Sequence, residues 1–207
     1  MKPIINLSLV FILMIWSFYS FSQTKKVNLD SLTLVYNQYK KEDTIKLNKL
    51  FDLINVFFKT NIEKASEYAD EALKLSEKIN DPYYKARSYF TQASIRISSG
   101  KNDDAILWLN KALPIFEKLK KTKHVGDVYE KYGAIELSKR DYIKAESYYE
   151  NAINYYQKSK AIKEEYQTRS KIAYIYSQKG EFKKSIDIQN DIIRYFEKNK
   201  MIREMDA

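Results

Sequence analysis

The sequence predicts an all-α fold, a solenoid built from antiparallel helix pairs. Small residues recur at intervals of 40, apolar residues within each interval are spaced three and four apart, and helix breakers separate the apolar runs. A fixed interval means that each unit packs on its neighbours and not around one common centre. Two columns of mostly small residues carry the repeat: Ala65, Ala105, Ala145 and Ser185, then Ala72, Ala112, Ala152 and Ile192.

The register continues beyond these two columns. A charged column holds Glu77, Glu117 and Glu197 together with Gln157, so the outward face is repeated along with the core. In the partner helix, a further column reads Leu53, Ala93, Gly133 and Ala173. We expect ten residues to mark the close contacts between helices: Ala65, Ala72, Ala93, Ala105, Ala112, Gly133, Ala145, Ala152, Ala173 and Ser185.

Breakers and apolar spacing define the predicted elements in chain order. Asp81-Pro82 supplies a capping carboxylate and a proline in the first helical turn, and Gly100 and Gly180 each precede a new helix. The predicted helix pairs are 43–59 with 61–80, 82–99 with 102–121, 124–139 with 141–159, and 162–179 with 181–199. The corresponding repeats span 41–80, 81–121, 122–160 and 161–200.

Additional segments flank the four repeats. Leu29 and Leu32 fall in register with Ala69 and Ala72, which predicts a capping helix over 28–40. Residues 201–207 read as the start of an incomplete fifth repeat, so the last helix lacks a covering neighbour. Each apolar side chain left in water forfeits about 1.5 to 3 kcal/mol, and a continuation of the chain or a partner is expected to cover them. The residues expected to stay partly exposed are Ile186, Ile192, Ile193 and Phe196.

Residues 1–22 have the pattern of a secretory signal peptide. Lys2 precedes an uncharged run over 4–21, and Ser20-Phe21-Ser22 places small residues at the usual cleavage spacing. We expect cleavage after Ser22 and export to the periplasm or the exterior of a bacterium. The alternative is an uncleaved anchor, for which an 18-residue run is at the short limit. Membrane contact is expected only through this segment, if it is retained.

The columns of small residues, the turn Gly180-Glu181-Phe182 and the run from Ala145 to Ala152 resemble the tetratricopeptide repeat (TPR) family, over residues 43–207. The resemblance implies a right-handed superhelix whose first helices line a concave protein-binding surface. Arg169 departs from the family pattern, because a bulky residue is usual there, and Leu53 is large where a small residue is usual. The family's basic unit is about 34 residues, so the longer unit is similar to those of bacterial signalling regulators and kinesin light chain.

The family position of the concave surface implies which side chains would meet a partner. In the first repeat, Leu50, Ile54 and Phe57 have two interpretations: they line the groove, or they pack on helix 28–40. In the later repeats the implied partner-binding groove contains Arg87, Phe90, Ser94, Asp127, Glu130, Gln167, Ser170 and Tyr174.

The chain is basic, with 36 Lys and Arg against 27 Asp and Glu and a formal net charge of +9. Lysines such as Lys118, Lys158 and Lys198 gather at the ends of second helices, where they offset the negative end of the helix dipole. A nucleic-acid partner is therefore not expected. Binding of a polyanion or a membrane surface through this lysine-rich edge is the alternative function.

The residues offer little for catalysis or metal binding. The chain has no cysteine and a single histidine, His124, which is expected to be a surface residue in the turn between the second and third units. Asp103-Asp104 falls in the first turn of a helix, where negative charge stabilises unpaired amides. The four glycines form no phosphate-binding cluster. We expect no enzymatic activity, no metal and no cofactor.

These observations predict a protein–protein interaction scaffold that binds a peptide or protein partner in the groove of the solenoid. The signal segment and the incomplete fifth repeat suggest a more specific role, as the exported sensory or interaction part of a signalling protein. In that case the partner could be a missing C-terminal output domain.

Overall fold

A computed structural model describes residues 29–199, and within that range every regular element is a helix. Residues 29–38 are helical, and the predicted all-α class built from helix pairs is confirmed. The predicted signal peptide and the start of a fifth repeat lie outside the described residues. The helices that follow are α2 (Thr44–Phe57), α3 (Ile62–Ile79), α4 (Pro82–Ser98), α5 (Asn102–Lys118), α6 (Thr122–Ser138), α7 (Tyr142–Ser159), α8 (Ile162–Gln178) and α9 (Phe182–Lys198).

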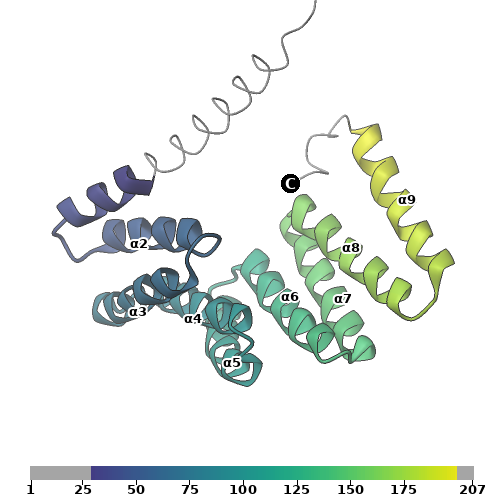
Figure 1. Ribbon diagram of the computed structural model, residues 1–207, viewed down its shortest axis with the longest axis horizontal. Coiled ribbons are helices and arrows are strands. Elements are labelled where there is room, and N and C mark those ends of the chain that lie inside the picture. Colours follow the sequence, from purple (N-terminus) through teal and green to yellow (C-terminus); the bar gives the residue numbers. More distant parts are fainter. Residues whose placement is uncertain (1–28, 200–207) are drawn as a thin grey trace, which may run out of the picture. The chain divides into compact units, whose positions relative to one another are not determined.

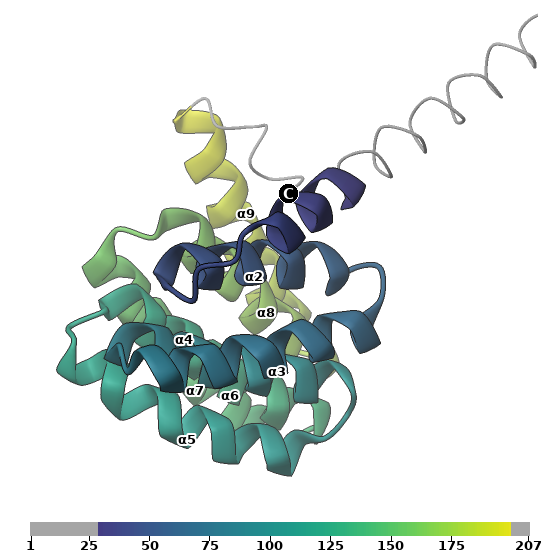
Figure 2. The ribbon, with the colours of Figure 1, turned by 90° about the vertical axis from the view of Figure 1, so that its left-hand side faces the viewer.

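The chain divides into two compact units, unit 1 (Met1–Ile79) and unit 2 (Asn80–Ala207). In unit 1, α2 and α3 form a hairpin (Figure 2). Its core includes Tyr36 from the helical segment 29–38, whose ring meets Tyr68 edge-on at 5.8 Å between centroids. Leu50, Ile54 and Phe57 are each at most 5% exposed, so in the structure they belong to this core and line no groove.

Unit 2 contains three helix hairpins in succession, α4–α5, α6–α7 and α8–α9 (Figure 1). Each helix contacts the next one along the chain, and α4 also contacts α6. Contacts between consecutive elements are typical of a solenoid, in which a hairpin buries its apolar face only when its neighbours are present.

The turns of unit 2 repeat at half the period of the hairpins. A left-handed residue with φ between 53° and 76° follows each of the helices α3 to α8, at 20-residue intervals. After α4, the Gly100 N–H bonds the Ile97 carbonyl at 3.0 Å and the Lys101 N–H bonds the Arg96 carbonyl at 2.8 Å, which is a Schellman C-cap. The left-handed positions are Asn80, Gly100, Lys120, Arg140, Lys160 and Gly180.

The columns of small residues lie at the seams between helices. Eight of the ten residues are alanines with 0% exposure, and Ser185 is 4% exposed. The tenth, Gly133, sits against the ring of Tyr149: a Cβ added to the glycine would lie 2.6 Å from the ring's Cδ1. A side chain of any size at this position would therefore displace a buried ring.

The predicted exposure of apolar residues on the last helix, α9, is only partly confirmed. Ile186 and Ile193 are 55% and 39% exposed, as predicted. The same prediction is wrong for Ile192 and Phe196, which are 9% and 3% exposed. Phe196 is covered from within its own hairpin, since the ring of Tyr166 on α8 lies 5.3 Å away. Across residues 29–199, no helix is both long enough and apolar enough to cross a bilayer.

Candidate partner-binding face

The eight predicted groove residues all lie on the first helices of the three hairpins of unit 2. Helix α4 carries Arg87, Phe90 and Ser94, α6 carries Asp127 and Glu130, and α8 carries Gln167, Ser170 and Tyr174. Helices α4 and α6 contact each other, and ion pairs join α6 to α8. We call the side of these helices that bears the eight residues the α4–α6–α8 face.

The two outer helices present different surfaces on this face. On α8, Gln167 and Ser170 are exposed and Tyr174 is 51% exposed. On α4, Phe90 packs partly against the core, and the Ser94 hydroxyl donates to the Phe90 carbonyl at 3.1 Å. The part of the face that is most accessible to a partner is therefore on α8, where an exposed aromatic ring stands beside polar groups.

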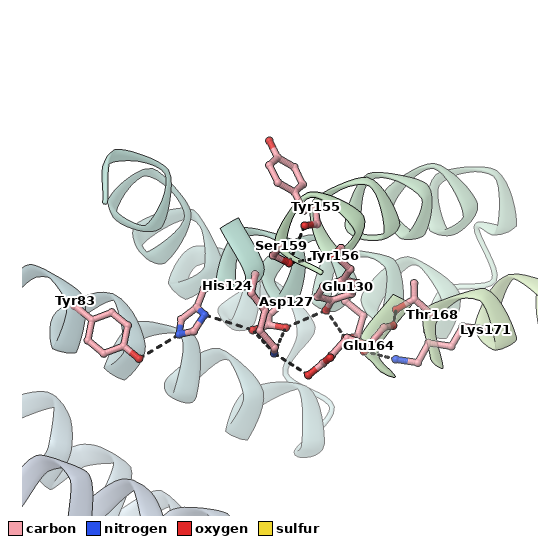
Figure 3. A network of polar contacts seen from close by, with 11 residues as sticks. Tyr83, His124, Asp127, Glu130, Tyr155, Tyr156, Ser159, Glu164, Thr168 and Lys171 are labelled. Atoms are coloured by element: carbon pink, nitrogen blue, oxygen red, sulfur yellow. Dashed lines mark hydrogen bonds and ion pairs between the residues drawn. The ribbon is translucent and has the colours of Figure 1, made fainter. Parts of the chain in front are cut away.

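The middle of the face is a polar network centred on two carboxylates (Figure 3). The Tyr156 hydroxyl from α7 lies 3.0 Å from Asp127 Oδ1 and 2.9 Å from Glu130 Oε2. A phenol has one hydrogen to donate, so it serves one carboxylate at a time. Lys123 and Lys171 supply further donors, and His124 Nδ1 lies 3.9 Å from Asp127 Oδ2.

These lysines join neighbouring helices. Lys123 Nζ lies 3.2 Å from Asp127 Oδ1 and 3.0 Å from Glu164 Oε1 on α8, and Lys171 on α8 pairs with Glu130 on α6. The side chains of Asp127 and Glu130 are only 21% and 19% exposed, so both carboxylates are largely withdrawn from water. These interactions fix the spacing of α6 and α8 and leave few carboxylate lone pairs free for a partner.

The pKa values of the network follow from the balance of burial and charge. Burial raises the pKa of Asp127 above its usual value despite the nearby Lys123. Burial also acts to raise the pKa of Glu130, but Lys171, Lys131 and the Tyr156 hydroxyl outweigh it and the pKa falls below its usual value. For Tyr156, burial and the two carboxylates raise the pKa. At neutral pH the phenol is therefore a proton donor.

The prediction for His124 is wrong. It lies in the first turn of α6, which begins at Thr122, and not in the turn before that helix. Its side chain is 30% exposed, its ring meets Phe116 edge-on at 4.9 Å, and its Nε2 lies 3.2 Å from the Tyr83 hydroxyl. Burial lowers its pKa below the usual value. The imidazole therefore belongs to the seam between α4, α5 and α6.

The predicted groove residues omit the partners that organise the network. Three of its contacts join residues that are 41 positions apart: Tyr83 with His124, Lys123 with Glu164, and Glu130 with Lys171. An offset of one repeat plus one residue is visible in the sequence and could have identified these pairs. Within residues 29–199, no group of three or more His, Asp or Glu side chains is placed to hold a metal ion.

Solved structures with a similar fold are helical repeat proteins. A Rap protein complexed with competence and sporulation factor matches with a TM-score of 0.77 at 20% identity, over 91% of this chain and 54% of that one. A putative kinesin light chain of nearly identical TPR-like repeats from Podosopora anserina matches with a TM-score of 0.63 at 12% identity, over 89% and 92%. At these identities the likeness shows the fold.

A third similar structure is a signal transduction ATPase with numerous domains from Pyrococcus horikoshii, which has a tetratricopeptide repeat sensor. It matches with a TM-score of 0.63 at 23% identity, over 81% of this chain and 27% of that one. The chain thus spans about half the length of the Rap protein and about a quarter of this ATPase. Among curated proteins none matches significantly.

The model of the family described as soluble NSF attachment protein, SNAP, matches residues 55–205, which is well over half of the chain. The match covers the helix pairs from the end of α2 onward, and the similar solved structures have TPR-like repeats. The resemblance to helical repeats of the TPR type is confirmed, and the chain belongs to the soluble NSF attachment protein (SNAP) family of TPR-like helical repeat proteins.

Proposed function

We propose that unit 2 is a non-enzymatic interaction scaffold that binds a peptide or protein segment across the α4–α6–α8 face. The observation that carries this proposal is the arrangement of the face: α4 contacts α6, ion pairs join α6 to α8, and exposed Tyr174, Gln167 and Ser170 stand on α8 at one end. A face whose spacing is set before binding loses less entropy on association. The Rap structure of similar fold is a complex with competence and sporulation factor, which supports a peptide or protein as the ligand class.

A peptide-display selection against the purified chain tests this proposal. Peptides that bind the face should lose about tenfold or more in affinity on Tyr174→Ala, because an exposed aromatic anchor is removed. Ile143→Ala is the matched control, since Ile143 is 80% exposed and lies on α7, away from the face. Selected peptides that respond equally to both variants, or to neither, would contradict the assignment.

The salt dependence of the same peptides separates this function from polyanion binding. Affinity carried by Tyr174 and the polar groups of α8 should change little with added salt, whereas binding through the lysine-rich edge should weaken steeply. A selection dominated by acidic, salt-sensitive peptides would favour the polyanion alternative.

We further propose that the protein is exported and serves as the sensory or interaction part of a signalling system. The support is the sequence pattern of residues 1–22 together with the solenoid fold. Expression of the chain with its own N-terminus in a bacterial host, followed by intact-mass analysis, should show a mature protein that begins at Gln23. An unprocessed chain in the membrane fraction would instead favour the anchor.

A further inference from the structure

A groove of about 430 Å³ lies between α7, α8 and α9, away from the α4–α6–α8 network. Ile153, Ile172 and Ile188 form its apolar floor, and Tyr176 closes one side. Its rim is polar, with Glu150, Asn154, Gln157 and Arg169. The volume is within the range of roughly 300 to 1,000 Å³ typical of ligand sites.

The same position in the preceding repeat is occupied by the chain's own phenol rings. Tyr129 and Tyr132 on α6 and Tyr148 on α7 cluster there, with ring centroids 5.4 Å apart for Tyr132 and Tyr148 and 6.4 Å apart for Tyr129 and Tyr148. Tyr132 is only 9% exposed. The residues exactly one repeat later are Arg169, Ile172 and Ile188, so three rings are missing where the groove opens.

The polar partner of the buried phenol is also replaced by a groove residue. The Tyr132 hydroxyl donates to Asn110 Oδ1 at 2.5 Å. One repeat later, Glu150 occupies the position of Asn110 and stands on the rim of the groove. A carboxylate accepts a hydrogen bond from a phenol more strongly than an amide does.

The walls of the groove are held in place by contacts outside it. The Arg169 guanidinium donates to Glu165 Oε1 at 2.8 and 3.0 Å, and Gln157 Nε2 donates to the same oxygen at 2.9 Å. The Tyr176 hydroxyl bonds to Glu146, and the Lys179 ammonium lies 5.1 Å from the Tyr176 ring centroid. A groove with fixed walls requires little rearrangement to accept a ligand.

We propose that this groove binds the side chain of a tyrosine presented by a peptide or protein partner, with its ring on the three isoleucines and its hydroxyl donated to Glu150. The partner would restore the contacts that Tyr132 and Tyr148 make one repeat earlier. The groove is separate from the α4–α6–α8 face, so this proposal is independent of the function assigned to that face.

Methyl NMR of isoleucine-labelled protein tests the proposal with p-cresol, the free analogue of the tyrosine side chain. We expect p-cresol to shift the methyl signals of Ile172 and Ile188. Glu150→Ala should weaken p-cresol binding by about tenfold, as expected for loss of a hydrogen bond to a charged group, while toluene, which has no hydroxyl, should bind both proteins alike. Asn110→Ala is the matched control and should leave p-cresol binding unchanged.

Ile188→Tyr places a ring of the chain's own at the position of Tyr148 and should abolish the p-cresol shift of the Ile172 methyl signals while the protein remains folded. In the unaltered protein, a short peptide with one tyrosine should shift the same methyl signals as p-cresol. The same peptide with phenylalanine in place of tyrosine should bind about tenfold more weakly. Absence of p-cresol shifts at Ile172 and Ile188 in the unaltered protein, or an unchanged Ile172 shift in Ile188→Tyr, would overturn the site. If p-cresol binds and the tyrosine peptide does not, the proposal that a peptide or protein partner presents the phenol ring would be overturned.

Discussion

Counted from α2–α3, the third and fourth hairpins of the described chain are α6–α7 and α8–α9, and they share one register but fill their seams differently. In the third hairpin Gly133 faces Tyr149, whose ring leaves no space for a Cβ. The fourth hairpin has Ala173 and Gln189 at the corresponding positions, and here the alanine is buried and the glutamine exposed. The large buried ring is thus accompanied by the smallest residue opposite it, because a close-packed seam has no room for both a ring and a Cβ.

The two hairpins also differ in how much of their apolar surface is covered. Helix α7 packs against both α6 and α8, and Ile153 on it is 8% exposed. At the corresponding position on α9, Ile193 is 39% exposed. An identical residue type in the same column therefore has a different burial, because the following helix supplies part of the cover in a solenoid.

The largest expected effect is the loss of the ring that fills the third hairpin. Tyr149→Ala should lower the free energy of unfolding by about 3 to 5 kcal/mol, because Tyr149 is 1% exposed and its removal leaves a cavity. Gln189→Ala at the same column of the fourth hairpin should change it by less than about 0.5 kcal/mol. Urea denaturation measures both, and similar losses would contradict the difference between the hairpins.

Overpacking of a seam should have the next largest effect. Ala145→Leu should destabilise by about 1 to 3 kcal/mol, since Ala145 is 0% exposed between helices. Ala161, which is half-buried in the turn before α8, should accept leucine with little change. Thermal denaturation of the two variants compares a seam with a turn, and equal tolerance would argue against tight contact at Ala145.

A double-mutant cycle can measure the coupling of Gly133 to Tyr149. Gly133→Ala should destabilise by about 1 to 2 kcal/mol, because the clash with the ring exceeds the gain of about 1 kcal/mol in helix propensity. In a Tyr149→Leu background the same change should be neutral or stabilising. If the two changes in the free energy of unfolding are additive, the Tyr149 ring is not the reason that position 133 requires a glycine.

A substitution at a left-handed turn should have a smaller effect, and it should increase the stability of the protein. Lys160 has φ 57°, which a lysine adopts at a cost and a glycine does not. Lys160→Gly should stabilise the protein by about 1 kcal/mol, and Gly180→Lys, one turn later in the chain, should destabilise it by a similar amount. A loss of stability in Lys160→Gly, measured by denaturant titration, would contradict the role of φ at this turn.

The smallest effect is the contribution of His124 to the pH dependence of stability. Burial lowers the pKa of His124 in the folded state, so the unfolded chain binds a proton more readily. The free energy of unfolding should therefore decrease as the pH falls below about 6.5, the usual pKa of histidine. The chain has one histidine, so its imidazole signals can be followed without ambiguity in an NMR titration. A measured pKa at or above 6.5 would show that burial in this seam is not the dominant influence.

The helix pairs were predictable from the sequence because every repeat copies the same local pattern. In the second pair, for example, the first helix is predicted over 82–99 and observed over Pro82–Ser98. The turns at Lys120, Arg140 and Lys160 carried no breaker signal, since their left-handed conformation is imposed by the helices on either side. His124 was misplaced for a related reason, because α6 begins two residues before it.

The candidate face was predictable only in part. Family position identified the helices, but Asp127 and Glu130 proved to be engaged with Lys123, Lys171 and Tyr156 inside the protein. These pairings join different helices, and side-chain reach across a seam is a property of packing and not of any one segment.

By itself, the sequence determined the all-α class, the 40-residue period and the columns of small residues, because helical periodicity and close helix contact leave local marks on the chain. Only the tertiary structure decided which seams are filled and which stay open. The cluster of Tyr129, Tyr132 and Tyr148 and the open groove one repeat later occupy equivalent positions, yet burial depends on the volume that neighbouring helices bring together. That volume is a sum over residues far apart in the chain.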